Sequence, residues 1–206
     1  MKDLTVNKNR LRTQETLAKL LAAAEEVFVR DGYDGAQLAE IAAVAGRSKG
    51  ALYGHFKSKE DLFFALFDYR TKGYVDKFWK KVEICTNRRQ RMKAYRECFL
   101  DLVTDRTLPI LTLEFKLYSL RHPESKLHMQ KALEQTLPTS NEKLLTRVFG
   151  KLPQKQRTNV DLAILALGPL VSGLILESHF YPQHLSDQAI RQLLGKQFDA
   201  LFSQQE

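Results

Sequence analysis

The sequence predicts an all-α protein, in which a small three-helix domain at the amino terminus precedes a larger helical domain. Apolar residues recur at spacings of three and four along most of the 206-residue chain, and residues typical of helix caps and breaks separate these stretches. No run of alternating apolar and polar residues is long enough to form a convincing strand. The composition, with 44% hydrophobic and 27% charged residues, excludes a disordered or collagen-like chain.

The first helix is predicted to begin at Thr13 and to end at Gly32. Thr13 suits the N-cap position, and Glu15 falls in the first turn, where the helix dipole favours negative charge. The apolar residues that repeat at helical spacing are Leu17, Leu20, Leu21, Ala24, Val27 and Phe28. This pattern predicts an amphipathic helix with one buried face.

Two short helices are predicted next. The first has one buried stripe, which consists of Leu38, Ile41, Ala42 and Ala45. It ends at Gly46, because glycine accepts the positive φ that commonly follows a helix. Ser48 then caps a second short helix, in which Leu52 and Phe56 lie four residues apart and point inward.

A fourth helix is predicted to begin at Ser58. Ser58 with the acidic Asp61 three residues later is a capping-box-like pattern. The apolar residues that follow are Leu62, Phe63, Leu66 and Phe67. We expect this helix to connect an amino-terminal domain at residues 11–71 to a carboxy-terminal domain at residues 72–206.

Five more helices are predicted beyond residue 70. The breaks between them are expected near residues 87, 107–109, 122–123, 150–153 and 181–182. Pro138 and Pro169 lie inside the predicted segments 123–149 and 158–180. Each should kink or split its helix, because proline lacks a backbone donor and crowds the carbonyl four residues earlier.

The two short helices and the Gly46-Arg47 turn between them form a helix-turn-helix pattern. In such a motif the first helix braces the second, which is narrow enough to lie in the major groove of DNA. An unrelated helical hairpin in a bundle has the same spacing. The spacing alone therefore does not decide between the two interpretations.

The residues around this motif resemble the DNA-binding signature of TetR-family regulators, of the AcrR type. The matching motifs, in the family's order and spacing, are Ala45-Gly46, Ser48-Lys49-Gly50-Ala51-Leu52-Tyr53, His55-Phe56 and Ser58-Lys59-Glu60-Asp61-Leu62. The resemblance covers residues 12–62 and is highly specific. It implies a helix-turn-helix domain that binds operator DNA and a carboxy-terminal domain that dimerises and binds a small-molecule effector.

The resemblance also implies which residues contact DNA. Ser48, Lys49, Gly50 and Ala51 would face the groove, with Lys49 as the residue that binds a guanine O6/N7 edge. The residues expected at phosphates are Tyr53, His55 and Lys59, the last at a helix amino terminus that favours an anion. Gln37 and Arg47 depart from the family pattern, which often has a capping threonine and a small apolar residue there, and we expect altered base or phosphate contacts from both.

The formal net charge of +8 favours an anionic partner such as nucleic acid. The excess is concentrated at residues 70–96, which contain ten Lys or Arg residues against two Asp or Glu residues. This basic stretch is either a solvated helix face or a second surface for nucleic acid. In the resembling family the fourth helix leads away from the DNA duplex, which favours the solvated face.

Aromatic residues concentrate in the second half of the fourth helix and beyond it, and they suggest an effector pocket for an apolar or aromatic ligand. The residues proposed to line it are Phe78, Trp79, Tyr95, Phe99, Glu114 and Tyr118. The alternative is that the aromatic residues form ordinary core. Glu114 would then be solvated or paired in a salt bridge rather than bound to a cationic ligand.

The last two predicted helices, about 158–180 and 185–203, suggest a homodimer. The first carries small residues among Leu, Ile and Val, which permits close helix packing, and the second has an apolar stripe. The interface residues expected from this pattern are Ala166, Gly173, Leu194 and Phe198. The alternative is that both helices only close the core of the monomer.

Other functions find no support in the sequence. There is no catalytic signature and no His or Cys spacing typical of a metal site, so we expect no enzyme activity, no metal and no cofactor. Cys85 and Cys98 are expected to be reduced thiols, and neither a transmembrane helix nor a secretory signal is predicted, which favours the cytoplasm.

The sequence thus predicts a transcriptional regulator, expected to be a ligand-released repressor that binds a palindromic operator as a dimer. The alternative function is a helical effector-binding or interaction module without operator recognition, for which the basic stretch 70–96 would be the working surface. The sequence identifies neither the effector, nor the operator, nor the regulated genes.

Overall fold

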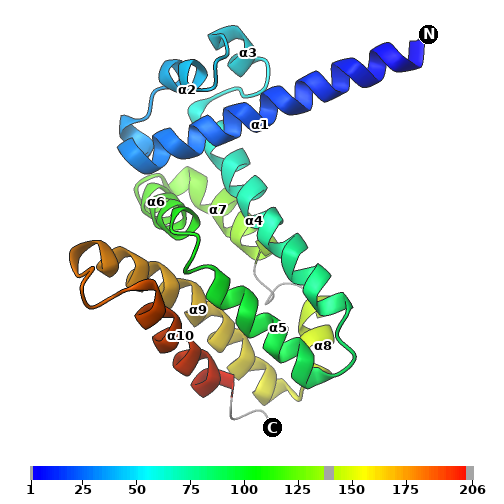
Figure 1. The fold of residues 1–206 in the computed structure, drawn as a ribbon, viewed down its shortest axis with the longest axis vertical. Helices are drawn as coiled ribbons and strands as arrows, with labels where there is room; N and C mark the ends of the chain where they lie inside the picture. Colours follow the sequence, from blue (N-terminus) through cyan, green and yellow to red (C-terminus); the bar gives the residue numbers. More distant parts are fainter. Residues whose placement is uncertain (1, 137–141, 203–206) are drawn as a thin grey trace. The chain divides into compact units, whose positions relative to one another are not determined.

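The computed structural model describes residues 2–136 and 142–202, with side chains for residues 11–131 and 145–202. The secondary structure within these residues is helical and contains no strand, which confirms the predicted all-α class (Figure 1). The chain divides into two compact units, Met1–Tyr69 and Arg70–Glu206. Helix α4, Lys59–Glu83, contributes its first turns to one unit and its remainder to the other.

The first unit contains α1 (Lys2–Gly35), α2 (Leu38–Val44), α3 (Lys49–Tyr53) and the start of α4. The N-cap predicted at Thr13 is wrong, because α1 begins eleven residues earlier. No glycine or proline interrupts residues 2–12, and most of them are good helix formers. Gly32 does break the helix as predicted, with φ 71° and ψ 176°, although one further turn follows it.

The core of the first unit lies between α1, α2, α3 and the start of α4. Leu20, Ile41 and Leu52 are completely buried, so all three helices of the predicted amino-terminal domain contribute to it. The rings of Phe28 and Phe63 lie 4.6 Å apart between centroids and join α1 to α4. Burial of these apolar side chains holds the short helices α2 and α3 in place.

Within its described residues, the second unit contains the rest of α4 and six further helices. They are α5 (Arg88–Asp101), α6 (Thr107–Arg121), α7 (Pro123–Thr136), α8 (Glu142–Phe149), α9 (Gln154–Phe180) and α10 (Asp187–Phe202). The predicted break near residue 87 is confirmed, since the side chain of Asn87 caps α5 by accepting a hydrogen bond from the backbone N–H of Gln90 (2.9 Å). Helix α9 packs against α6 and α10, as Figure 1 shows for the last pair.

The structure describes one of the two prolines. Pro138 lies outside the described residues, between the end of α7 and the start of α8. Helix α9 runs without a break through Pro169, so the predicted interruption there is wrong. Pro169 and Leu165, whose carbonyl loses its partner, are both on the side of α9 that faces away from the core of the subunit, so the proline ring is not crowded by core residues.

An aromatic cluster forms the centre of the second unit. The ring of Tyr95 lies between 5.4 and 6.1 Å, centroid to centroid, from the rings of Phe78, Phe149, Phe198 and Phe202. Burial raises the pKa of the Tyr95 phenol well above its usual range. This cluster explains the aromatic content of the sequence as ordinary core.

This core corrects one sequence prediction and leaves another as a prediction. Phe78, Tyr95 and Phe99, expected to line a pocket, are buried among other core residues, and their role in an effector pocket stays a prediction. Leu194 and Phe198, expected at a dimer interface, are 0% and 3% exposed and belong to the core of their own subunit. Helical periodicity marks an apolar face, but it does not say whether that face meets the same chain or a second copy.

Helix α9 is long and apolar enough to cross a membrane by length and composition alone, with a mean hydropathy of 1.9 over its most apolar 18 residues. Its packing explains this composition in another way. One face, which includes Val160, Ile164, Val171 and Ile175, is buried in the core of the second unit. Much of the apolar character of α9 is therefore that of a core helix.

Candidate nucleic-acid interface

The turn between α2 and α3 has the geometry of a helix-terminating loop closed by glycine. Gly46 has φ 62°, a left-handed conformation in which a side chain would be strained. The backbone N–H of Arg47 bonds to the carbonyl of Ala42 (2.9 Å), and that of Gly46 to the carbonyl of Ala43 (3.0 Å). These two bonds are those of a Schellman motif, and they fix the direction in which the chain leaves α2.

Helix α3 begins immediately after this turn. The Oγ of Ser48 accepts a hydrogen bond from the backbone N–H of Ala51 (3.1 Å), which confirms the predicted cap. Leu52 is completely buried and Phe56 is 4% exposed, so the inner face of α3 and of the residues after it is fixed in the core. The first turn of α3 is consequently presented to solvent.

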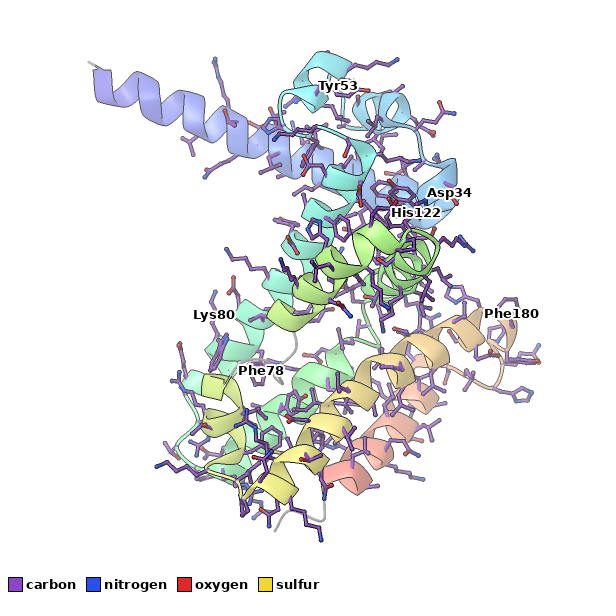
Figure 2. All side chains as sticks on the ribbon, turned by 180° about the vertical axis from the view of Figure 1, so that it is seen from behind. Asp34, Tyr53, Phe78, Lys80, His122 and Phe180 are labelled. Carbon is purple, nitrogen blue, oxygen red and sulfur yellow. The ribbon has the colours of Figure 1, made fainter. Side chains whose placement is uncertain are left out.

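The outer face of α3 contains the residues expected to read bases. Lys49 and Gly50 are exposed, and Ala51 is half-buried beside them. Tyr53, which Figure 2 labels on α3, is 56% exposed, an unusual degree for a tyrosine in a packed domain. A basic side chain, a glycine and a phenol on one exposed helix are well suited to base and phosphate contacts.

The remaining predicted contacts lie around this helix. Gln37 is exposed at the N-cap of α2 and its side chain makes no capping hydrogen bond. His55 is half-buried, with its ring centroid 6.1 Å from that of Phe56. Arg47 is half-buried, and its Nη1 donates to the carbonyl of Gly46 (3.3 Å). These roles in DNA binding stay predictions.

Lys59, expected at a phosphate, has a different set of partners in the structure. Its Nζ donates to the carbonyl oxygens of Tyr33 (2.8 Å), Asp34 (3.2 Å) and Ala36 (3.1 Å), and it lies 4.6 Å from the centroid of the Tyr33 ring. An ammonium group has three donors, and all three are used here. A phosphate contact from Lys59 therefore requires the exchange of one of these carbonyls for a phosphate oxygen.

Lys59 instead ties the start of α4 to the end of α1. The unpaired carbonyls at a helix carboxyl end carry a partial negative charge, which the ammonium group neutralises. The first turn of α4 has its own cap, since the Oγ of Ser58 accepts from the N–H of Asp61 (3.0 Å) and a carboxylate oxygen of Asp61 accepts from the N–H of Lys57 (2.9 Å). The capping pattern predicted from the sequence is thus confirmed.

A second connection in this unit was missed by the sequence interpretation. The guanidinium of Arg30, near the end of α1, pairs with Asp31 (Nε to Oδ1 2.7 Å) and with Glu40 of α2. The hydrogen bond from Arg30 lowers the pKa of the Asp31 carboxyl. These groups are exposed, so the pair contributes little to stability and serves mainly to orient α2.

Comparison with known proteins supports this interpretation of the site. Residues 20–66 match the family described as bacterial regulatory proteins, tetR family. The chain is 41% identical over 95 residues to the HTH-type transcriptional activator FasR of Mycolicibacterium smegmatis, an alignment that covers 46% of this chain and 43% of that protein. The matched segments span about half or less of the length of the curated relatives.

Solved structures match over most of the chain. The fatty acid degradation regulator FadR of Bacillus halodurans superposes with a TM-score of 0.69 at 25% identity, over 87% of this chain and 94% of that one. FadR of Bacillus subtilis, solved in complex with stearoyl-CoA, superposes with a TM-score of 0.67 at 20% identity, over 90% and 97% of the two chains. The second of these shows the fold alone.

The fold of the first unit and the exposed α3 define a helix-turn-helix unit of the class found in DNA-binding regulators. More particularly, the amino-terminal unit is a TetR-family DNA-binding domain, and the resemblance seen in residues 12–62 is confirmed. The relatives and structural neighbours named above are regulators, which agrees with the prediction that this chain is not an enzyme.

The positions on α3 generate a prediction about sequence preference. Lys49→Ala should relax preference for the operator and cost about 1–3 kcal/mol on the preferred site, because base contacts specify and phosphate contacts position. Tyr53→Phe should weaken binding to all duplexes alike. Titration of specific and scrambled duplexes measures both effects, and an unchanged specificity ratio in Lys49→Ala would contradict its role.

The partners of Lys59 generate a second prediction. Lys59→Met should lower the free energy of unfolding by about 1–3 kcal/mol, because three carbonyl groups lose a charged donor. Lys57→Met is the matched control, since Lys57 is an exposed lysine two residues earlier in the chain. Chemical denaturation followed by circular dichroism measures the difference. Equal stability of the two variants, with weaker DNA binding only in Lys59→Met, would favour the phosphate role instead.

Proposed function

We propose that this protein is a ligand-responsive transcriptional repressor that binds a palindromic operator as a homodimer. The observation that carries the proposal is the exposed first turn of α3, which is fixed by the Gly46 turn and by the buried Leu52. A single helix of this length reaches few base pairs. Two copies on one face of the duplex read two half-sites about 34–36 Å apart.

The structure supports a dimer face on α9 that differs from the one expected. An apolar stripe runs along α9 at helical spacing. Its exposed members are Leu162, Leu165, Pro169, Leu176 and Phe180, the last labelled in Figure 2 at the end of α9, and the half-buried Ala166 and Gly173 lie between them. Leu193 of α10 is also exposed. Nothing lies within 4 Å of a Cβ built on Gly173, so a second helix has room to approach there.

This face suits an interface with a second copy of the chain. Phe180 is 70% exposed and Leu162 is 62% exposed, and side chains of this size are costly to leave in water along a whole helix. Ala166 and Gly173 keep their proposed interface role, whereas Leu194 and Phe198 belong to the core of the subunit. Helices from two copies would pack as a four-helix interface.

Release of DNA by an effector follows from linkage. A ligand that releases the operator must bind the DNA-incompetent state more tightly, and DNA must then weaken the ligand to the same degree. The structural neighbour in complex with stearoyl-CoA supports a small-molecule effector for this chain. FasR is named an activator, so the direction of regulation is the part of the proposal that needs a transcription assay.

The proposal predicts the form of the operator. Genomic fragments selected by the purified protein should contain an inverted repeat with half-site centres about one helical turn apart. Binding should weaken steeply as salt rises, because phosphate contacts release counterions. Transcription from a promoter that carries the repeat should fall when the protein is added. Selection of no common sequence would favour an interaction module without operator recognition.

The proposed dimer face predicts the effect of one substitution. Gly173→Arg should give helical monomers and weaken operator binding by about 100-fold or more, because the second half-site no longer adds to the first. Gly73→Arg is the matched control, since Gly73 is exposed on α4 and also has open space around it. Sedimentation and operator titration measure the outcome. A wild-type monomer at micromolar concentration with tight operator binding would refute the dimer.

A further inference from the structure

The second unit contains a cavity of about 820 Å³ beside α4. Its walls come from α4, the end of α5 and the segment that leads into α6, and the lining residues are Arg70, Tyr74, Lys77, Lys80, Lys81, Cys98, Asp101, Thr104, Asp105, Arg106 and Thr107. None of the residues expected from the sequence to line an effector pocket is among them. Five of the lining residues are cationic and two are acidic.

The first acidic residue of the wall, Asp105, has hydrogen-bond donors on both of its carboxylate oxygens. The carboxylate of Asp105 accepts hydrogen bonds from Arg70, from the hydroxyl of Tyr74 (2.9 Å), and from the backbone N–H groups of Thr107 (3.2 Å) and Leu108 (3.1 Å). Burial alone would raise the pKa of this carboxyl, but these donors together lower it. Asp105 is therefore held as an anion, and its two carboxylate oxygens are already used by these four donors.

The second acidic residue is also paired. A carboxylate oxygen of Asp101 accepts from Nζ of Lys81 (2.9 Å), and its other oxygen lies 3.6 Å from Nη2 of Arg191. The remaining arginine of the wall, Arg106, pairs with Asp187 and donates to the hydroxyl of Ser178 (3.1 Å). Arg70, Lys81 and Arg106 are thus neutralised by carboxylates of the protein.

Two cations of the wall remain. Lys77 and Lys80 are exposed on α4, and within the described side chains neither forms an ion pair. The ammonium of Lys77 lies 5.6 Å from the centroid of the Tyr74 ring, and Figure 2 labels Lys80 on the same helix. Like charges three residues apart on a helix repel each other, so this pair carries a small cost in the unliganded protein.

We propose that this cavity is the effector site and that it binds a small organic anion. The ammonium groups of Lys77 and Lys80 bind the phosphate or carboxylate groups of that anion. The proposal rests on the proposed function only in assigning the cavity to the effector. An anion between the two ammonium groups relieves their repulsion and takes the place of a carboxylate partner, which no described side chain supplies within ion-pair distance.

The shape of the site favours a small molecule over a nucleic acid. A cavity of about 820 Å³ lies within the range of small-molecule sites. The hydroxyl groups of Thr104 and Thr107 and the half-buried thiol of Cys98 offer further polar contacts on its wall. Lys77 and Lys80 belong to the basic stretch 70–96, so the proposal assigns a function to two of its ten basic residues.

Calorimetric titration of the full chain, without DNA and at low ionic strength, tests the proposal. The probes are tripolyphosphate and citrate, which separate phosphate from carboxylate recognition. We expect at least one of them to bind the wild type and to bind the Lys77→Gln/Lys80→Gln variant about tenfold or more weakly. The matched control is Arg89→Gln/Lys93→Gln, which removes two exposed charges of α5 that do not line the cavity.

Four results would overturn the proposal. They are no binding of either anion to the wild type, equal binding to the cavity variant, an equal loss in the control variant, and a loss of affinity for all DNA sequences in the cavity variant, which would identify a nucleic-acid surface. Operator titration of the wild type in the same preparation tests the proposed function separately from anion binding. If the wild type binds no operator, the proposed function is contradicted, and the anion binding that was measured is unaffected.

Discussion

The DNA-binding unit depends on the burial of one side of a very short helix. A five-residue helix such as α3 is not stable alone, because the first turn costs more conformational entropy than its few hydrogen bonds return. It persists because Leu52 is completely buried and because the Gly46 turn delivers the chain at the right angle. The exposure of Lys49 and Tyr53 is a direct consequence, since a helix fixed on one side must present the other to solvent.

Charge is arranged differently in the two units. In the first, Lys59 and Arg30 brace helix ends, so basic side chains near the candidate DNA interface are partly used for structure. In the second, carboxylates neutralise three cations of the cavity wall, while Lys77 and Lys80 have no carboxylate among the described side chains. Two lysines without an ion-pair partner on a concave wall are better explained by a ligand than by solubility, for which convex surface would serve.

Some elements could be predicted from the sequence because their causes are local. Ser48, Ser58 and Asn87 cap helices, and Gly32 and Gly46 interrupt them, because each acts on backbone groups within a few residues. The predictions of a helix start at Thr13 and of an interruption at Pro169 are wrong, because each residue permits a helix end without forcing one. A helix continues past a possible cap when nothing stops it, and it tolerates a proline on a face that lies outside the core.

The sequence by itself determined the all-α class and the TetR-type signature of residues 12–62, because helical periodicity and capping depend on neighbours in the chain. Only the tertiary structure decided that Phe78, Tyr95, Leu194 and Phe198 form core, and that the exposed apolar stripe lies on the other face of α9. It also decided which cations are paired. The physical reason is that burial and ion pairing join residues far apart in sequence, such as Arg106 and Asp187, whose meeting no local pattern encodes.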